Sequence, residues 1–472
     1  MTMYDIHDLN RRRNEIMQRS VAIDYSAFEF EGIGFDYDAL MRSSGYTYED
    51  IVSIQSASMV GRTPLVELKN ITDYARKFAK PGMGARILVK DEATNLSGSF
   101  KARRAAISVH KAKELGYKGV IAATSGNYGA AVAALAAKHG LKCIIVQECF
   151  DSRNVAQPEI LEKARACEAY GAEVIQLSVG PELFYTFLHL LDETGYFNAS
   201  LYSPYGIMGI ETLGYEIAEE VNRRFSRHPD VVVCTNAGGG NLTGTARGLR
   251  RYGADTTQIY AASVNLQGLH MASDHDFNRK SFTTGHTGFG IPFTTRPDRS
   301  DVPRSAARPL RYMDKYFTVN QGSVFFITEA LSVLEGMERG PAGNTSLAVA
   351  FKLAQSMEKD AIIVVQETEY SGAGKHHQPQ LSFAKSNHIE VKMGNPISEV
   401  PGKNIILPSS GRLLDIQEIA LDSLRRSYLK HFDLKHLKEQ DLRFLQEELQ
   451  VKTNHLEALI ASLGGVVHER TT

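Results

Sequence analysis

Short apolar runs separated by longer amphipathic stretches constrain the fold of this chain more than any other feature. Four of them are "KGVIAATS" (118–125), "KCIIVQE" (142–148), "DVVVCTNAGGG" (230–240) and "DAIIVVQET" (360–368). Their Val and Ile residues are continuous rather than alternating with polar residues. A strand of this kind is buried on both faces, which is typical of parallel sheets covered by helices. The sequence therefore predicts an α/β fold with parallel-rich sheets.

Charge and composition exclude several classes of protein. The 53 Lys and Arg residues nearly balance the 54 Asp and Glu residues, which argues against a nucleic acid or an anionic membrane held by overall electrostatic attraction. No window approaches the roughly 18–20 continuous apolar residues of a membrane span, and the N-terminus lacks the apolar core of a secretory signal. The four cysteines form no CxxC pair or Cys/His cluster, so we expect no metal site. These features predict a reduced, cytoplasmic protein with Cys143 and Cys234 in its core.

A glycine-rich loop, "TNAGGGNLTGTARG" (235–248), follows a predicted strand and opens a predicted helix. Gly238, Gly239 and Gly240, followed by Asn241, allow backbone N–H groups to approach an anion at the positive end of that helix. No GK[ST] follows, and no acid stands at the spacing of a dinucleotide-binding loop, which disfavours a nucleotide-dependent dehydrogenase. The loop therefore predicts a phosphate site, with a tight structural turn as the alternative.

A second strand–loop–helix junction lies in "ATSGNYGAA" (123–131). Thr124, Ser125, Gly126 and Asn127 would present hydroxyl, amide and backbone donors at a helix N-terminus, where a carboxylate binds favourably. The alternative is an ordinary N-terminal cap. A third segment, "ETEYSGAGKH" (367–376), places Ser371 at the carboxyl end of a strand, the usual ligand side of α/β folds. Its alternative is a glycine turn.

Lys101 lies in "SGSFKARRA" (97–105), in the first turn of a helix expected over 99–115, with Ser97 and Ser99 as candidate caps. The positive end of a helix lowers the pKa of an ammonium group, and a neutral lysine is what Schiff-base formation requires. Taken alone, Lys101 would be expected to be a solvated surface lysine. With a phosphate loop, a carboxylate loop and a serine hydroxyl, however, it matches the functional groups of pyridoxal 5'-phosphate.

These segments resemble those of the fold-type II pyridoxal-phosphate enzymes, which include threonine synthase, O-acetylserine sulfhydrylase and the tryptophan synthase β chain. The order of the segments also matches, over roughly residues 55–400. The resemblance implies that Lys101 is the catalytic, Schiff-base lysine and that Asn127 binds the 3'-oxygen of the cofactor. It also implies that residues 238–241 bind the phosphate and that Ser371 faces the ring nitrogen.

Two positions depart from the family pattern. Ala102 stands where relatives commonly carry Asp, and Tyr128 stands where many have Thr. We include Tyr128 with residues 124–127 in the predicted carboxylate site. Because Tyr differs from Thr at this position, the loop is expected to bind a different substrate.

Longer segments resemble the β subunits of 2-amino-4-oxopentanoate thiolases of ornithine degradation, among them "GPELFYTFL" and "ERGPAGNTSLA". This resemblance extends to about residue 408. It implies an acyltransferase that cleaves 2-amino-4-oxopentanoate with coenzyme A to acetyl-CoA and alanine, without a cysteine nucleophile. It further implies a small α subunit as partner and a homodimeric core.

Other functions stay open on the sequence alone. A threonine-synthase-like enzyme or an ammonia-lyase would use the same cofactor for elimination or replacement, and a non-catalytic partner subunit would keep the fold without the chemistry. The irregular segment 265–322 is rich in Gly, Pro and Thr. The segment is either functional or a covering loop. Within it, residues 268–290, with His270, His275, Arg279 and His286, are predicted to form a substrate or coenzyme A gate, with a loop packed on a partner chain as the alternative.

The resemblance implies a tryptophan-synthase-β-like fold of two three-layer α/β domains. Residues 1–115 are expected to form an N-terminal segment and the start of the cofactor domain, and residues 116–204 a smaller α/β domain. Residues 205–408 are expected to form the larger, cofactor-binding domain. The charged, helix-periodic residues 409–472 predict a helical C-terminal extension.

Overall fold

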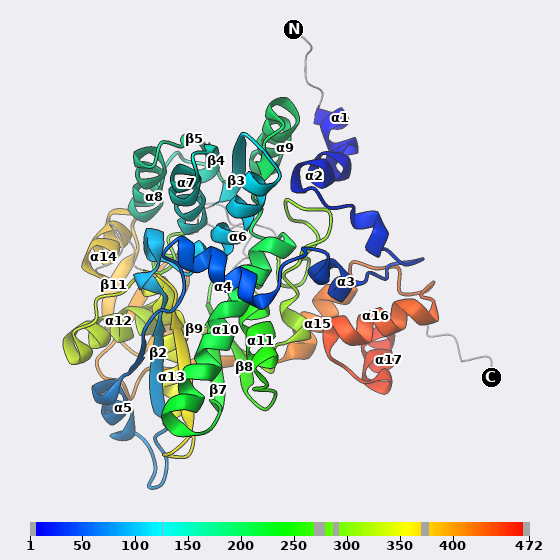
Figure 1. Cartoon of the computed structure of the whole chain (residues 1–472). Coiled ribbons are helices and arrows are strands. Elements are labelled where there is room, and N and C mark those ends of the chain that lie inside the picture. Colours follow the sequence, from blue (N-terminus) through cyan, green and yellow to red (C-terminus); the bar gives the residue numbers. More distant parts are fainter. Residues whose placement is uncertain (1–5, 125, 269–278, 287–291, 370–376, 466–472) are drawn as a thin grey trace.

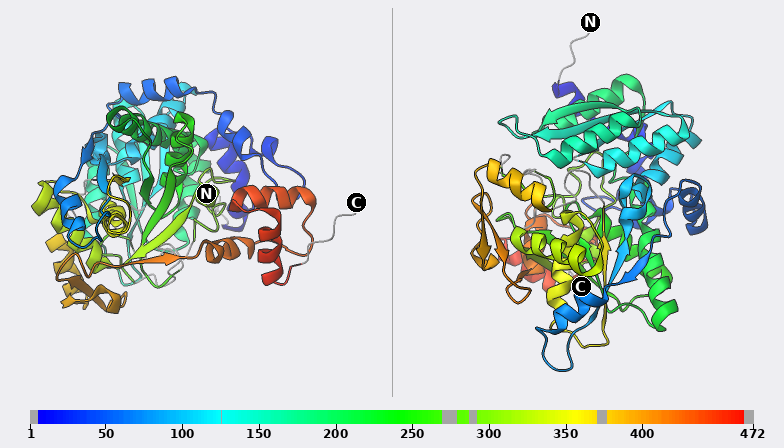
Figure 2. Two further views of the ribbon diagram at one scale, coloured as in Figure 1. Left: turned by 90° about the horizontal axis from the view of Figure 1, so that it is seen from below. Right: turned by 90° about the vertical axis from the view of Figure 1, so that its left-hand side faces the viewer.

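The computed structural model describes residues 6–124, 126–268, 279–286, 292–369 and 377–465 (Figure 1). Its main strands form a four-stranded sheet, in the order β5-β4-β3-β6, and a seven-stranded sheet, in the order β1-β2-β10-β7-β8-β9-β13. The smaller sheet lies above the larger one in Figure 1 and in the right-hand view of Figure 2. The predicted α/β class is confirmed.

The smaller sheet is parallel throughout. All six residues of its strand β3 are buried, as the continuous apolar run predicts. The helix that follows β3 ends where Gly140 adopts the left-handed conformation, with φ of 72°. The elements of this unit are β3 (Gly119–Thr124), α7 (Asn127–His139), β4 (Lys142–Phe150), α8 (Pro158–Ala169), β5 (Glu173–Ser178), α9 (Glu182–Thr194) and β6 (Phe197–Asn198).

The larger sheet has five parallel central strands and an antiparallel strand at each edge. Its strands are β1 (Leu65–Glu67), β2 (Arg86–Asp91), β7 (Val231–Thr235), β8 (Gln258–Val264), β9 (Lys315–Val319), β10 (Ile362–Glu367) and β13 (Ile416–Ile419). Alternate residues of the strands enter different cores. Val232 and Val364 pack on one face and Val233 and Val365 on the other, which makes three layers.

Helices cover both faces of the larger sheet. One face carries α10 (Pro204–Phe225) and α11 (Gly240–Tyr252), and the other carries α5 (Lys69–Arg76), α12 (Gln321–Glu335) and α13 (Pro341–Ala354). Helix α6 (Lys101–Glu114) packs between α10 and α7. Helices α10 and α11 approach closely, because a Cβ built on Gly248 would lie 1.9 Å from the Glu211 carbonyl oxygen. Glycine is therefore required at this contact.

The remaining elements frame this core. They are α1 (Ile6–Arg11), α2 (Arg13–Val21), α3 (Tyr37–Arg42), α4 (Tyr48–Ala57), α14 (His377–Ser386), β11 (Glu390–Gly394) and β12 (Asn404–Pro408), with 3₁₀ turns η1 (Tyr25–Phe28), η2 (Glu92–Thr94), η3 (Leu96–Gly98), η5 (Pro309–Arg311) and η6 (Pro396–Ser398). Among the described residues, none of the helices has the length and apolar composition needed to cross a membrane.

The C-terminal extension contains three helices, α15 (Leu421–Leu429), α16 (Glu439–Leu449) and α17 (Thr453–Ser462). The helical prediction is wrong for its first residues, however. "IQEI" forms strand β13, in which Ile416 pairs with Val319 at the edge of the larger sheet. The open edge of β9 supplies unpaired backbone groups, and satisfying them outweighs the weak helical periodicity of this segment.

Candidate active site

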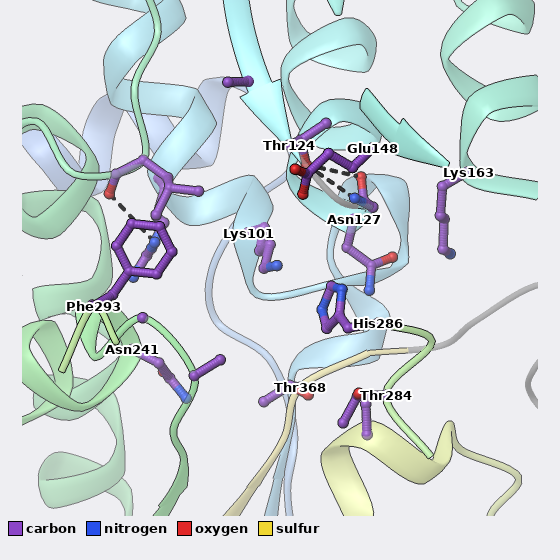
Figure 3. Close-up of a pocket in the computed structure, with 18 of the residues that line it drawn as sticks. Lys101, Thr124, Asn127, Glu148, Lys163, Asn241, Thr284, His286, Phe293 and Thr368 are labelled. Carbon is purple, nitrogen blue, oxygen red and sulfur yellow. Dashed lines mark hydrogen bonds between the residues drawn. The ribbon is translucent and has the colours of Figure 1, made fainter. Parts of the chain in front are cut away.

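A cavity of about 210 Å³ lies where the carboxyl ends of both parallel sheets meet (Figure 3). Open α/β sheets bind ligands at this edge. Residues after β3 and in β4 line it from the smaller unit, and residues after β7 and β10 line it from the larger one. Its ionisable side chains are Lys101, Arg104, Glu148, Glu159, Lys163, His286, Asp301 and Glu369.

Lys101 is the first residue of α6 and lines this cavity. Burial lowers the pKa of its ammonium group to about 8, and the positive charges of Arg104 and Lys163 act in the same direction. Glu369 opposes the shift. A substantial part of Lys101 is therefore neutral near neutral pH, as a lysine that attacks an aldehyde must be.

The predicted caps of α6 are wrong. Phe100 precedes the helix, and no side chain caps it. Ser97 adopts a left-handed conformation with φ of 63°, and the buried hydroxyls of Ser97 and Ser99 have no hydrogen-bond partner among the described residues. The backbone turns through η3 just before Lys101, so neither serine occupies the capping position directly before the helix.

The loop after β3 presents Asn127 to the cavity. Thr124 Oγ1 accepts from the N–H of Gly126 at 3.1 Å and of Gly129 at 3.3 Å, so Thr124 shapes the loop. Asn127 Nδ2 donates to the Glu369 carboxylate, while its buried Oδ1 has no partner in the described structure. This unpaired acceptor marks a place for a ligand donor.

The side chain of Tyr128 does not take part in the predicted carboxylate site. The ring is fully buried in the core, and the hydroxyl donates to the Ala199 carbonyl oxygen at 2.7 Å. Only the backbone of Tyr128 is left for the predicted role. A neighbouring residue of the loop, Ser125, lies outside the described residues, as does Ser371 beyond β10.

Glu369 is a site residue that sequence reasoning missed. It follows β10, is 6% exposed and has a raised carboxyl pKa, chiefly because of burial, while Lys101 and Lys163 act against the rise. Its position two residues before Ser371 is the only sequence signal that could have indicated it. Buried Glu residues are rare unless they are paired, so this one is a candidate for function.

The glycine loop closes the opposite end of the cavity from Lys163 (Figure 3). Gly239 precedes α11 in a left-handed conformation, with φ of 81°. A Cβ on Gly238 would lie 2.2 Å from the Tyr202 hydroxyl, so this wall tolerates no side chain. The buried Asn241 Oδ1 has no partner in the described structure, and Nδ2 donates weakly to the Thr235 carbonyl oxygen at 3.4 Å.

Segment 265–322 contributes Thr284, His286 and Phe293 to the cavity wall. Burial, together with the Lys101 charge, lowers the pKa of His286 to about 3, so its imidazole is neutral. Arg279 donates instead to the Leu266 carbonyl oxygen at 3.1 Å and does not line the cavity. Other predicted gate positions, at 269–278 and 287–291, lie outside the described residues.

The residues present fit pyridoxal phosphate. A buried lysine of lowered pKa faces the same cavity as a glycine loop in which added side chains would clash, and the side chains of Asn127 and Asn241 also line this cavity. No group of three or more metal-ligating side chains occurs in the described ranges. The four cysteines are buried, as expected for Cys143 and Cys234.

Comparisons with known proteins agree with this geometry. The profile of a family described as "Pyridoxal-phosphate dependent enzyme" matches residues 57–369. The chain is 64% identical, over 96% of its length and 97% of the relative's, to the 2-amino-4-ketopentanoate thiolase beta subunit of Acetoanaerobium sticklandii. It is 60% identical, over 96% of its length and 97% of the relative's, to a protein of the same name from an unknown prokaryote.

Among solved structures, a mutant of O-ureido-L-serine synthase with O-ureido-L-serine bound superposes with a TM-score of 0.53 at 18% identity, covering 70% of this chain and 92% of that one. This likeness supports the fold alone. The profile match and the similarity to the two relatives carry the assignment, and the chain therefore belongs to the family of pyridoxal-phosphate dependent enzymes.

Proposed function

We propose that this chain is the catalytic β subunit of a 2-amino-4-oxopentanoate thiolase. The observation that carries the proposal is the 64% identity that extends over 97% of the thiolase beta subunit and is not confined to the cofactor motifs. In the proposed reaction the C3–C4 bond of the substrate breaks and the acetyl carbon bonds to the coenzyme A sulfur. The thiol proton is balanced by the proton gained at C3, which leaves acetyl-CoA and alanine.

Bound pyridoxal phosphate would supply an electron-withdrawing group joined to the substrate amine. This group would stabilise negative charge at the α-carbon and, by conjugation, at C3, where the broken C3–C4 bond leaves its electrons. Lys101 would hold the cofactor aldehyde through Nζ and, once released by substrate, accept the α-proton. A pKa of about 8 suits both roles, because the amine is neutral often enough to take a proton and basic enough to keep it.

Glu369 is proposed to share a proton with Lys101. Burial favours the neutral carboxyl, whereas the nearby ammonium favours the carboxylate, so each group responds to the charge of the other. A carboxyl of raised pKa can donate a proton near neutral pH. Glu369 is thus our candidate for the acid that partners Lys101.

The remaining contacts are proposed from the family resemblance, and the described residues that line the cavity support part of them. Residues 124–128 at the start of α7 would bind the substrate carboxylate, with added attraction from Lys163 on the same wall. Asn127 would bind the 3'-oxygen of the cofactor, residues 238–241 its phosphate, and Ser371 its ring nitrogen.

The cysteines support a route in which coenzyme A itself brings the sulfur. Burial raises the pKa of the Cys149, Cys167 and Cys234 thiols to about 12 and raises that of Cys143 further. A thiol of such high pKa holds almost no thiolate at neutral pH. An acyl-cysteine intermediate is therefore not part of the proposal.

The relatives are named as beta subunits, which implies an alpha subunit partner for those proteins. We infer that this chain likewise works with a small α subunit, around a homodimeric core and in the cytoplasm. Size-exclusion chromatography of the co-expressed subunits tests the assembly. Elution of this chain alone at its monomer mass would argue against it.

The proposed activity is tested by incubating the cofactor-loaded protein, with and without the α subunit, with 2-amino-4-oxopentanoate and coenzyme A. Acetyl-CoA and alanine should appear in equal amounts. Lys101→Ala should lower the rate by at least about 10³-fold and abolish the absorbance band of lysine-bound cofactor. Lys111→Ala is the matched control, because Lys111 lies on the same helix, pairs with Glu114 and does not line the cavity. A 2-oxo acid and ammonia in place of acetyl-CoA would indicate an elimination enzyme instead.

A further inference from the structure

Arg103 and Arg104 are adjacent in sequence but have opposite environments. The guanidinium of Arg103 is paired with two buried acids, Glu92 at 2.7 Å and Glu216 at 2.8 Å. Arg104 is 3% exposed and forms no ion pair in the described structure. The other buried arginines, Arg308 and Arg311, also contact carboxylates. Arg104 is thus the exception.

The position of Arg104 follows from helical spacing. Residues three apart lie on the same face of a helix, so Arg104 shares a face with Lys101, and both line the cavity. The Arg104 guanidinium lies against the phosphate-type loop, because a Cβ built on Gly240 would be 2.0 Å from its Nη2. The lysine and the arginine therefore serve the same cavity from one helix.

The hydrogen bonding of Arg104 is incomplete. Nη1 donates to the Leu201 carbonyl oxygen at 3.3 Å, and the buried Nε has no partner among the described residues. Its guanidinium carbon is 5.6 Å from the centre of the Phe100 ring. Burial without a carboxylate lowers the guanidinium pKa to about 10. A buried cation is costly unless an anion or several hydrogen bonds compensate it, so this site is built for an anion.

We propose that Arg104 binds the phosphate of the cofactor, supplying the positive charge that the neutral glycine loop lacks. The loop offers backbone N–H groups at the start of α11, and the planar guanidinium adds charged donors that match phosphate oxygens. This inference depends on the family assignment and not on the thiolase reaction, so it stands or falls separately from the proposed function.

The test compares pyridoxal phosphate with pyridoxal, which lacks the phosphate. Each is titrated into cofactor-free protein and followed by the absorbance of the lysine-bound aldehyde. Arg104→Gln should weaken the binding of pyridoxal phosphate at least about tenfold and leave that of pyridoxal within about twofold. Equal weakening of both ligands, or no weakening of either, would overturn the proposal.

Two further variants keep the test decisive. Arg104→Lys retains the positive charge without the planar guanidinium and should give an intermediate loss of affinity for pyridoxal phosphate. This variant replaces Arg104→Gln if Arg104→Gln does not fold. Lys163→Gln removes a positive charge from the opposite end of the same cavity (Figure 3) and should leave the preference for the phosphorylated ligand unchanged.

Competition with inorganic ions separates the phosphate from a carboxylate as the bound anion. Phosphate should slow the loading of wild-type cofactor-free protein with pyridoxal phosphate and should lose most of this effect in Arg104→Gln. If acetate competes instead and phosphate does not, Arg104 binds a substrate carboxylate and the proposal fails.

Discussion

At the residue scale, the environment of Lys101 determines its chemistry. Burial lowers the ammonium pKa to about 8 from its ordinary value of 10.5. At pH 7.5 about a quarter of such a lysine is neutral, against about a thousandth of an unperturbed one. The fold thus increases the population of the reactive amine by about two orders of magnitude.

This shift predicts the pH dependence of cofactor attachment. Because only the neutral amine attacks the aldehyde, the attachment rate in cofactor-free protein should rise about tenfold per pH unit below about pH 8 and level off above it. Stopped-flow absorbance between pH 6 and 10 measures the profile. Nα-acetyl-lysine is the reference, and its rate should keep rising to about pH 10.4. A protein profile that follows the reference would contradict the shift.

At the element scale, α16 supports the glycine-loop end of the cavity from outside. Its Glu448 is 2% exposed, accepts from Arg311 and from the Tyr428 hydroxyl, and lies 3.5 Å from Arg308. The next residue, Pro309, packs against the glycine loop, since a Cβ on Gly239 would lie 2.4 Å from it. The C-terminal extension therefore supports the glycine loop through η5 without lining the cavity.

Glu448→Gln should destabilise the protein by about 3 kcal/mol, because it leaves buried arginines without their shared acid. Glu447→Gln is the matched control. Glu447 is the neighbouring acid, is 68% exposed and lies 3.6 Å from Arg311, so its loss should cost at most about 1 kcal/mol. Urea unfolding followed by circular dichroism measures both variants. Equal effects would show that the buried cluster adds no stability.

At the scale of the whole molecule, the cavity joins the two sheets. Its walls come from the carboxyl ends of β3 and β4 on one side and of β7 and β10 on the other. A ligand attached at Lys101 and held at the glycine loop would contact both units. Cofactor binding should therefore stabilise the folded chain as a whole.

A cofactor concentration of about 100 times its dissociation constant contributes about 2.7 kcal/mol, which corresponds to a rise of about 3 °C in the melting temperature of a chain this long. Differential scanning calorimetry with and without pyridoxal phosphate measures the rise. Lys101→Ala should show a smaller one, because it loses the covalent link. A melting temperature that cofactor leaves unchanged would show that the cavity does not bind it in the folded state.

Local patterns carried most of the correct fold predictions. The continuous apolar runs form β3, β4, β7 and β10. A strand that is buried on both faces is apolar along its whole length, so the run alone is enough to predict it. Strand β13 was predicted as helix, since its pairing with β9 depends on an edge about a hundred residues away in the chain. The predicted domain boundaries and site assignments stay predictions.

The sequence by itself determined the α/β class and the family, and it predicted the cofactor motifs, because each of these resides in a few contiguous residues. Only the tertiary structure decided that burial lowers the pKa of Lys101, that no serine caps its helix, and that Tyr128 turns into the core. It alone brought Glu369 to Asn127 and gave Arg104 no acidic partner among the described residues. Desolvation and ion pairing depend on residues distant in the chain, and a single sequence does not encode those distances in any local pattern.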